Sequence, residues 1–218
     1  MSLYIALGDS ITAGECASSW SLAYPSLVTS MLSQQRSIWN GEVLAEPGWT
    51  SQDLFYYVTN HSPVYLEQAK VVSLWVGGDN LVDAARQILG GAPRSAIHKA
   101  LVGYSQSLAA LLQMIRQISR AQIIVCTQYN PFPNSPIASE TIEALNTATL
   151  SVASRMQTSV APCHTWFAGR QAELIYGYRN GKIQDVLTSP IAPVHPNNLG
   201  HRVIAQNLVP LVRSQPMG

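Results

Sequence analysis

The chain has 218 residues, of which 47% are hydrophobic, and this is enough for one domain with a sizeable buried core. Only 11% of the residues are charged, well below the roughly 25% that is usual in soluble proteins. With 13 basic and 12 acidic residues the formal net charge is +1, which offers no electrostatic attraction to DNA or RNA. The composition therefore excludes nucleic acid from the expected partners.

Features of membrane and secreted proteins are missing from the sequence. No apolar run approaches the roughly 20 residues that a membrane span requires. The first residues lack the basic region and the long apolar stretch of a signal peptide, so we expect a cytoplasmic protein. Cys16, Cys126 and Cys163 agree with this expectation, because their odd number and wide spacing favour neither a disulfide framework nor a zinc site.

Short apolar runs alternate with longer segments of helical periodicity, as is typical of a parallel sheet with crossover helices. Strands are expected, in chain order, at 3–7, 43–45, 71–76, 122–126 and 159–161. Helices are expected at 24–34, 53–58, 95–119, 139–156 and 198–212. Since we find neither an internal repeat nor a low-complexity linker, we predict a single α/β domain over residues 1–218. Sites in such sheets form at the carboxyl ends of the strands.

The first candidate for chemistry is Ser10, in the tetrapeptide Gly8-Asp9-Ser10-Ile11 directly after the first expected strand. The glycine permits a tight turn, so a serine here is held rigidly, and its own backbone N–H can point at a developing oxyanion. A serine or aspartate at such a junction also serves as a helix cap or turn residue. The tetrapeptide alone leaves both roles open.

His195 lies in a Pro- and Asn-rich segment just before the last expected helix. A neutral imidazole there can accept a serine proton and later protonate a leaving group, although a surface histidine in a turn is the simpler alternative. His195 and His201 are six positions apart, which does not match the usual pair of metal ligands on one helix face. We expect neither a metal nor an organic cofactor.

Four motifs occur in order: Gly8-Asp9-Ser10, Gly48, Gly77-Gly78-Asp79-Asn80 and His195-Pro196. In this order and spacing the chain resembles the SGNH (GDSL) family of serine hydrolases over nearly its whole length. The resemblance implies a flavodoxin-like three-layer α/β/α sandwich with a mostly parallel five-stranded sheet. It also implies ester hydrolysis through an acyl-enzyme on Ser10, with His195 as general base and acid. The oxyanion hole would consist of the Ser10 and Gly48 N–H groups and an Asn side chain, and Asp9 would brace the nucleophile loop.

The third motif departs from the family pattern, which reads Gly-x-Asn-Asp, because Asp79 and Asn80 stand in exchanged order. A carboxylate at the Asn position would repel a developing oxyanion and cannot donate a hydrogen bond to it. We therefore predict that Asn80, displaced by one residue, is the donor and that Asp79 supports the site. Losing such a donor costs on the order of 10²–10³ in rate.

The second departure concerns the orientation of His195, because Ala192 stands where the family usually carries an Asp three residues before the His. Three substitutes are open. A backbone carbonyl of segment 189–192 could accept from the second ring nitrogen, which is the solution we expect. Asp185 could fold back as a third catalytic residue, or Asp79 could serve after a rearrangement of the loops.

The predicted function is hydrolysis of small acyl esters, with O-acetylated sugars, lysophospholipids and thioesters as possible substrates. The expected partner is thus a small acyl ester, and the sequence leaves the oligomeric state open. The alternative is a catalytically degenerate relative that binds an acylated ligand or a protein, which the changes at Ala192 and Asp79 suggest. A flavin or nucleotide module is disfavoured because the chain has no G-x-G-x-x-G or Walker sequence.

Overall fold

A computed structural model describes residues 1–34, 38–61 and 63–213, and its centre is a parallel sheet of five strands in the order β2-β1-β3-β4-β5. Its strands are β1 (Ser2–Gly8), β2 (Trp39–Ala45), β3 (Val71–Trp75), β4 (Gln122–Cys126) and β5 (Ser159–Ala161). All five coincide with predicted strands. Only β2 begins well before its predicted start, because it is an edge strand whose first residues are largely exposed and show no apolar alternation.

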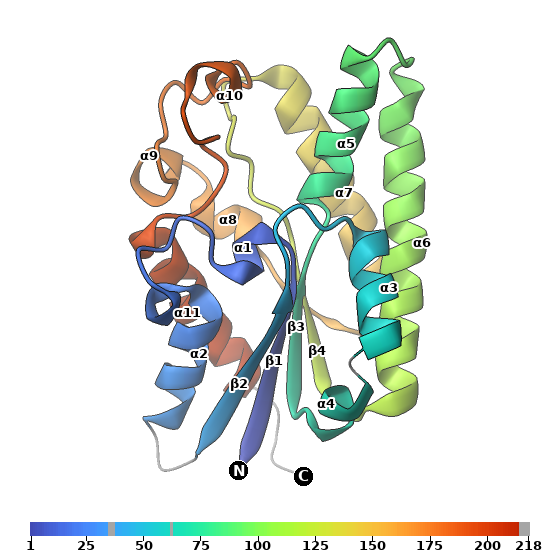
Figure 1. Ribbon diagram of the computed structural model, residues 1–218, viewed down its shortest axis with the longest axis vertical. Helices are drawn as coiled ribbons and strands as arrows, with labels where there is room; N and C mark the ends of the chain where they lie inside the picture. Colours follow the sequence, from blue (N-terminus) through green and yellow to red (C-terminus); the bar gives the residue numbers. More distant parts are fainter. Residues whose placement is uncertain (35–37, 62, 214–218) are drawn as a thin grey trace.

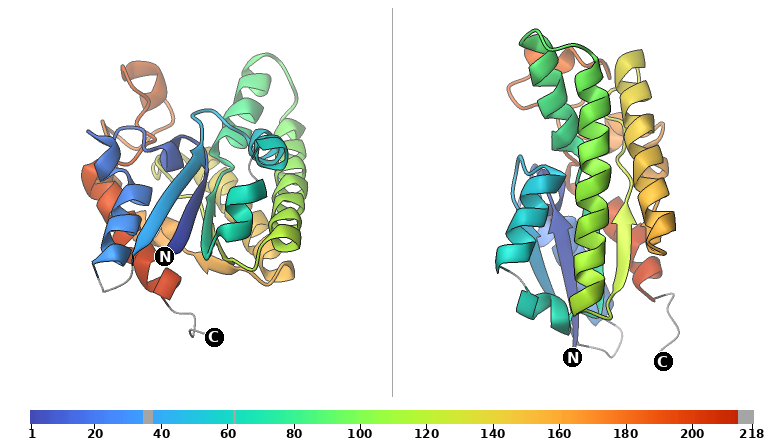
Figure 2. Two further views of the ribbon diagram at one scale, coloured as in Figure 1. Left: turned by 60° about the horizontal axis from the view of Figure 1, so that its bottom comes forward. Right: turned by 90° about the vertical axis from the view of Figure 1, so that its right-hand side faces the viewer.

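Helices cover both faces of the sheet, which gives the predicted three-layer α/β/α architecture (Figures 1 and 2). One face carries α2 (Tyr24–Ser33), α8 (Cys163–Phe167) and α11 (Asn198–Arg213). The other carries α3 (Ser51–His61), α4 (Pro63–Gln68), α6 (Ser95–Ile118) and α7 (Pro136–Arg155), with α5 (Gly78–Leu89) packed against α6. The short helical segments α1 (Ser10–Ala13), η1 (Trp20–Leu22), α9 (Gln171–Leu174) and α10 (Asp185–Thr188) lie in the connecting loops.

The central strands are buried on both faces, so alternate side chains of one strand belong to two different cores. In β1, Tyr4 and Ala6 pack with α2 and α11, whereas Ile5 and Leu7 pack with α3 and α6. The apolar stripe predicted on the longest helix faces the second core, where four of its members are fully buried: Tyr104, Leu108, Leu111 and Ile115. This arrangement explains why the strands read as continuous apolar runs.

The α5 helix has no counterpart among the predicted elements. Its apolar residues Leu81, Ala84, Ala85 and Ile88 do recur at helical spacing, so the sequence prediction overlooked an amphipathic helix of which only Ala84 is buried. It begins at Gly78, so Asp79 and Asn80 lie in its first turn rather than in an open loop. No helix among the described residues combines the length and the apolar character that a membrane crossing demands.

Candidate functional site

Ser10 lies where the inner strand β1 passes into α1, with only Asp9 between strand and helix. A side chain at Gly8 would collide with the Trp75 carbonyl and the Thr12 hydroxyl, so only glycine allows this close approach of β1, β3 and α1. The Asp9 side chain caps α1 by accepting a hydrogen bond from the Ile11 N–H at 3.1 Å. Ser10 is therefore held in a fixed turn at the carboxyl end of the sheet.

The predicted bracing role of Asp9 agrees with its contacts and its environment. Its backbone N–H donates to the Trp75 carbonyl at 3.3 Å, and its carboxyl group is 1% exposed. Burial first, and then the charge of Asp79, raise the pKa of Asp9 to about 8. At neutral pH the group is therefore mostly protonated, and it adds little negative charge beside Ser10.

His195 stands on the segment that leads into α11, and contacts with two separate parts of the chain fix this segment. The Tyr129 hydroxyl donates to the Val194 carbonyl, and the Tyr176 N–H donates to the His195 carbonyl at 2.9 Å. An isolated antiparallel bridge pairs Ile175 with Pro196. The backbone on both sides of the imidazole is thus attached to neighbouring loops.

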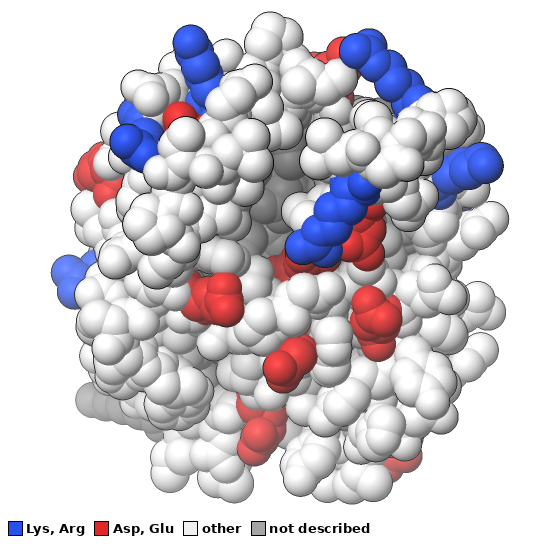
Figure 3. Space-filling view, turned by 45° about the horizontal axis from the view of Figure 1, so that its top comes forward, with Lys and Arg blue, Asp and Glu red and all other residues white. Residues whose placement is uncertain are grey.

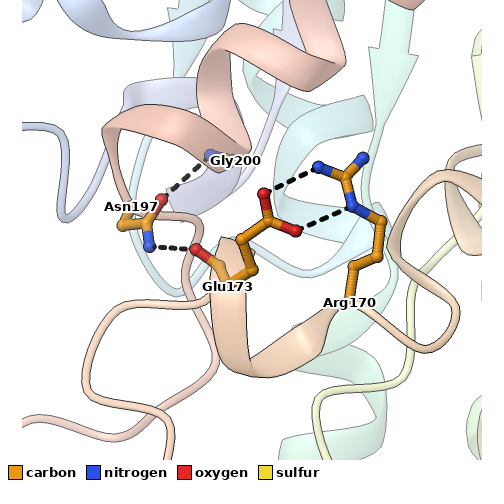
Figure 4. A network of polar contacts seen from close by, with 4 residues as sticks. All are labelled: Arg170, Glu173, Asn197 and Gly200. Atoms are coloured by element: carbon orange, nitrogen blue, oxygen red, sulfur yellow. Dashed lines mark hydrogen bonds and ion pairs between the residues drawn. The ribbon is translucent and has the colours of Figure 1, made fainter.

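Asn197, two residues after His195, forms hydrogen bonds with both α11 and α9 (Figure 4). Its Oδ1 accepts from the Gly200 N–H at 2.9 Å, which makes it the N-cap of α11, and its Nδ2 donates to the Glu173 carbonyl at 2.8 Å. The Glu173 carboxylate in turn forms a bidentate pair with Arg170 at 2.9 and 3.0 Å. The exposed ion pair is worth little by itself, but the Asn197 contacts fix where His195 enters the site.

The two predicted reacting groups lie within hydrogen-bond distance. The Nε2 atom of His195 is 2.9 Å from the Oγ atom of Ser10, and the His195 side chain is 13% exposed. Burial lowers the pKa of His195 below its usual 6.5, and the nearby Glu15 carboxylate opposes this effect. The imidazole is therefore largely neutral at pH 7, as an acceptor of the serine proton must be.

The expected substitutes for the missing Asp are not found at the second ring nitrogen. The His195 Nδ1 atom is buried and has no hydrogen-bond partner among the described residues, and the Ala192 carbonyl accepts from the Val194 N–H instead. The structure does not bring Asp185 to His195 either. The Asp185 carboxylate closes its own loop by accepting from the Asn180 and Lys182 N–H groups at 2.8 and 3.2 Å.

A residue that the sequence analysis missed contacts the imidazole. The Glu15 Oε2 atom lies 3.2 Å from His195 Nε2, on the same side of the ring as Ser10. No family motif includes Glu15, and a lone acidic residue after Gly14 carries no recognisable signal. The only available hint was its position five residues after Ser10, at the exit of the same short helix.

The second and third motifs lie on neighbouring loops that are hydrogen-bonded to each other. Gly48 follows β2 with a φ of 87°, a conformation that favours glycine. The Ser51 N–H at the start of α3 donates to Asn80 Oδ1 at 2.9 Å. Because the amide oxygen of Asn80 is occupied in this way, its NH₂ group is the part left to donate elsewhere.

Acidic side chains surround this end of the sheet. Burial first, and then Asp83, raise the pKa of Asp79 to about 6, with smaller contributions from Glu15 and Asp53, while Arg86 acts in the opposite direction. Figure 3 shows several acidic side chains gathered beside and below a hollow on this face, with a basic side chain reaching across them.

Clusters that suit a metal are not found in the described parts of the chain, where no three His, Cys, Asp or Glu side chains converge on one point. A shallow groove between α6 and α7, lined by residues such as Leu101, Ala109 and Ala148, contains none of the predicted site residues. The candidate chemistry is therefore confined to the loops after β1, β2 and β3 and to the segment before α11.

Comparison with solved structures supports the fold. A lipase from a goat rumen metagenome, Lip_vut3, superposes with a TM-score of 0.83 at 19% identity, and all of both chains is covered. Phospholipase A1 from Streptomyces albidoflavus NA297 gives 0.74 at 16% identity, with 99% of each chain covered. A catalytic mutant of Axe2, an acetylxylan esterase from Geobacillus stearothermophilus in which a histidine is replaced by alanine, gives 0.73 at 16% identity, with 98% and 95% covered.

Comparison with family models identifies the family itself. The model of the GDSL-like lipase/acylhydrolase family matches residues 6–203, which include every motif described above. No curated protein matches the chain. The chain belongs to the GDSL-like lipase/acylhydrolase family and is an ester-bond hydrolase of the esterase and lipase type.

Proposed function

We propose that the chain hydrolyses carboxylic esters through an acyl-enzyme on Ser10, with His195 as general base and then general acid. The observation that carries the proposal is the 2.9 Å separation of Ser10 Oγ and His195 Nε2. A nucleophile and a base within hydrogen-bond reach, on a rigid turn at the carboxyl end of a parallel sheet, are what acyl transfer requires. The catalytic mutants of the similar acetylxylan esterase, in which a serine or a histidine is replaced by alanine, agree with these roles.

The proposed reaction has two halves. In the first, Ser10 Oγ bonds to the acyl carbon while its proton passes to His195 Nε2, and the carbonyl electron pair moves onto oxygen. Collapse of this intermediate breaks the bond to the alcohol oxygen, which takes the proton from Nε2. In the second half a water molecule repeats these steps on the acyl-enzyme and releases the acid and free Ser10.

The proposed oxyanion hole consists of the Ser10 N–H, the Gly48 N–H and the Asn80 side-chain amide. Ser10 is the first residue of α1, so no carbonyl of that helix can accept from its N–H. The hydrogen bond from the Ser51 N–H holds the Asn80 oxygen and leaves the amide NH₂ as the donor. These features support Asn80, rather than Asp79, as the third donor of an electrostatic site of this kind.

We further propose that the substrates are esters of small, uncharged acyl groups, such as O-acetylated sugars, lysophospholipids or thioesters. The acidic side chains near the site, including Glu15 and Asp79, disfavour an anionic acyl group by charge repulsion. The similar structures include an acetylxylan esterase and a phospholipase A1, so both short acyl esters of sugars and lipid esters belong in the test set.

The test uses p-nitrophenyl esters of increasing acyl length, acetylated xylo-oligosaccharides, a lysophospholipid and a fluorophosphonate probe. We expect turnover of p-nitrophenyl acetate and stoichiometric labelling by the probe, and we expect both to disappear in Ser10→Ala. Ser21→Ala is the matched control, because Ser21 is an exposed serine of η1 whose side chain contacts Ser19 and not His195. Absence of turnover and labelling in the wild type would overturn the proposed function and favour a binding role for the fold.

A further inference from the structure

In the described parts of the chain, no carboxylate lies at the outer ring nitrogen of His195 to balance the charge that develops on the ring. When Ser10 transfers its proton, the imidazole becomes a cation in a site where the side chain is 13% exposed. The buried Nδ1 atom has no hydrogen-bond partner among the described residues, and Ala192 stands where an acidic residue would otherwise orient the ring. Because a buried cation without a partner is costly, a compensating charge elsewhere on the ring would speed the proton transfer.

Glu15 supplies a carboxylate at the other nitrogen. Its Oε2 atom lies 3.2 Å from His195 Nε2, the atom that is 2.9 Å from Ser10 Oγ. A neutral Nε2 that accepts from serine presents a lone pair, which a carboxylate does not attract. A protonated Nε2–H presents a donor and a positive charge, which the carboxylate attracts strongly. Glu15 therefore favours the state after proton transfer over the state before it, and such differential stabilisation is what accelerates a reaction.

The backbone around Glu15 is fixed by contacts that do not involve its side chain. The Glu15 N–H donates to the Ser10 carbonyl at 3.0 Å, which ties it to the nucleophile turn. The fully buried His201 on α11 accepts from the Tyr24 N–H at its Nδ1, so its Nε2 carries the proton that it donates to the Glu15 carbonyl at 3.2 Å. Ser18, three residues further on, is bonded to Asn198 at the start of α11.

The backbone of the residue after Glu15 is strained, which indicates that this loop is held in place by its contacts. Cys16 has a φ of 64°, in the left-handed region that non-glycine residues seldom adopt. Such residues persist only where surrounding contacts determine the backbone, and they cluster at functional sites. The contacts with His201 and Asn198 are of that kind, and their effect is to aim the Glu15 side chain at His195.

From this geometry we propose that Glu15 is a positioning residue for the reaction, which holds a negative charge against His195 Nε2 and stabilises the imidazolium formed when Ser10 attacks. The proposal rests on the proposed function of Ser10 and His195. Glu15 itself exchanges no proton: the proton leaves Ser10 Oγ, resides on Nε2 and departs on the alcohol oxygen. The carboxylate thus does at Nε2 part of what a triad aspartate does at the outer nitrogen.

The expected size of the effect is modest, because the Glu15 side chain is 43% exposed and solvent screens its charge. We expect Glu15→Gln to lower kcat/KM by about threefold to thirtyfold, far less than the roughly 10⁴ lost with a buried triad aspartate. We also expect the acid limb of the kcat/KM profile to move to lower pH by about 0.3–1 unit, because the neighbouring negative charge raises the pKa of His195.

The shift of the acid limb can be assigned to Glu15 once the other titratable groups near His195 are considered. Ser10 and Glu15 approach it from α1 and the loop that follows, and His201 approaches from α11. Burial first, and then the charge of His195, lower the pKa of His201 to about 4, with the Glu15 carbonyl opposing, so His201 is mostly neutral at neutral pH. Asp79 is influenced by Glu15 and has a pKa of about 6, so its titration is removed by repeating the measurement in Asp79→Asn.

The experiment compares wild type, Glu15→Gln, Glu15→Asp and Glu140→Gln. Glu140 is an exposed residue of α7, so its variant makes the same change in net charge away from the site. Activity is measured from pH 4.5 to 8.5 with p-nitrophenyl acetate, at low and high salt. The His195 ring is titrated separately by NMR on histidine-labelled protein, with His195→Ala used for assignment.

We expect Glu15→Gln to lower the titration midpoint of His195 in both measurements. High salt should also lower this midpoint in the wild type, because it screens the charge of Glu15, and should not change it in Glu15→Gln. Glu15→Asp, which keeps the charge on a shorter side chain, should recover part of the loss, and Glu140→Gln should resemble wild type. Equal midpoints in wild type and Glu15→Gln, or a higher kcat/KM in Glu15→Gln, would overturn the proposal. If the wild type neither hydrolyses the ester nor reacts with the fluorophosphonate probe, the proposed function has failed. The NMR titration midpoint of His195 still decides whether the charge of Glu15 acts on His195.

Discussion

The imidazole Nε2 of His195 lies 2.9 Å from the hydroxyl oxygen of Ser10, although 185 positions separate the two residues in the chain. Ser10 follows the inner strand β1, and His195 precedes α11, which packs beside α2 on one face of the sheet. The two ends of the chain therefore complete one site at the carboxyl edge of the sheet.

Replacing His195 by alanine removes the acceptor of the Ser10 proton. We expect kcat for p-nitrophenyl acetate to fall by about 10²–10⁴, the usual contribution of general acid–base catalysis. Steady-state kinetics measures the loss, and circular dichroism through thermal unfolding shows whether the fold is kept. A folded variant with more than a tenth of wild-type kcat would show that another group accepts the proton.

The pH dependence of the wild type reports the protonation of the same ring. Burial, opposed by Glu15, lowers the pKa of His195 below 6.5, and only the neutral imidazole can act as a base. Activity should therefore be lost as the pH falls through this lowered pKa, so the midpoint of the acid limb of kcat/KM should lie below 6.5. A profile from pH 4.5 to 8.5 measures it, and a midpoint above 6.5 would contradict the assignment.

Changing Asn80 tests the identity of the third oxyanion donor. We expect Asn80→Ala to lower kcat by about 10²–10³ with little change in KM, because the lost hydrogen bond strengthens only in the transition state. Asn80→Asp should lose at least as much, since a carboxylate at this position repels the oxyanion. Asn80→Ala removes the amide oxygen that accepts from the Ser51 N–H, and Asn80→Asp replaces it with a carboxylate oxygen. Thermal stability is therefore measured for both variants. Full activity in a stable Asn80→Ala variant would remove Asn80 from the oxyanion hole.

Asp79 provides a complementary test, because it brings an unfavourable charge next to Asn80. Its pKa is raised to about 6 by burial and by Asp83, so it is ionised above pH 6 and largely neutral at pH 5. We expect Asp79→Asn to raise kcat/KM at pH 8 by about threefold to tenfold, the size of one partly screened charge, and to change it little at pH 5. A loss of activity at pH 8 would instead show that the Asp79 carboxylate has a productive role.

Asp185 was the acidic residue that the sequence offered as a third catalytic group, and its contacts favour a structural role. Although burial acts to raise its pKa, the N–H groups of Asn180 and Lys182 hold it below the usual value. We expect Asp185→Asn to leave the acid limb of the pH profile in place and to lower the midpoint of thermal unfolding, because neutral hydrogen bonds replace charge-assisted ones. A displaced acid limb would revive a direct effect on His195.

Much of the fold was predictable because its signals are local. The strands of a parallel sheet are buried on both faces, so β1, β3 and β4 read as apolar runs, and the four-and-three spacing of the α6 stripe indicates one buried helix face. Where burial is slight, as at the start of β2, the signal fades and the predicted strand was too short. The α5 helix was missed although its apolar residues recur at helical spacing.

The sequence by itself determined the family, the α/β architecture and the identity of Ser10 and His195 as candidates, because these depend on residue types at short spacings and on their order. Only the tertiary structure decided what lies around the imidazole. It bound Asp185 within its own loop, gave His195 Nδ1 no partner among the residues that the structure describes, and brought the carboxylate of Glu15 to Nε2. The physical reason is that these contacts are set by how separate loops pack at one edge of the sheet, and no spacing along the chain records that packing.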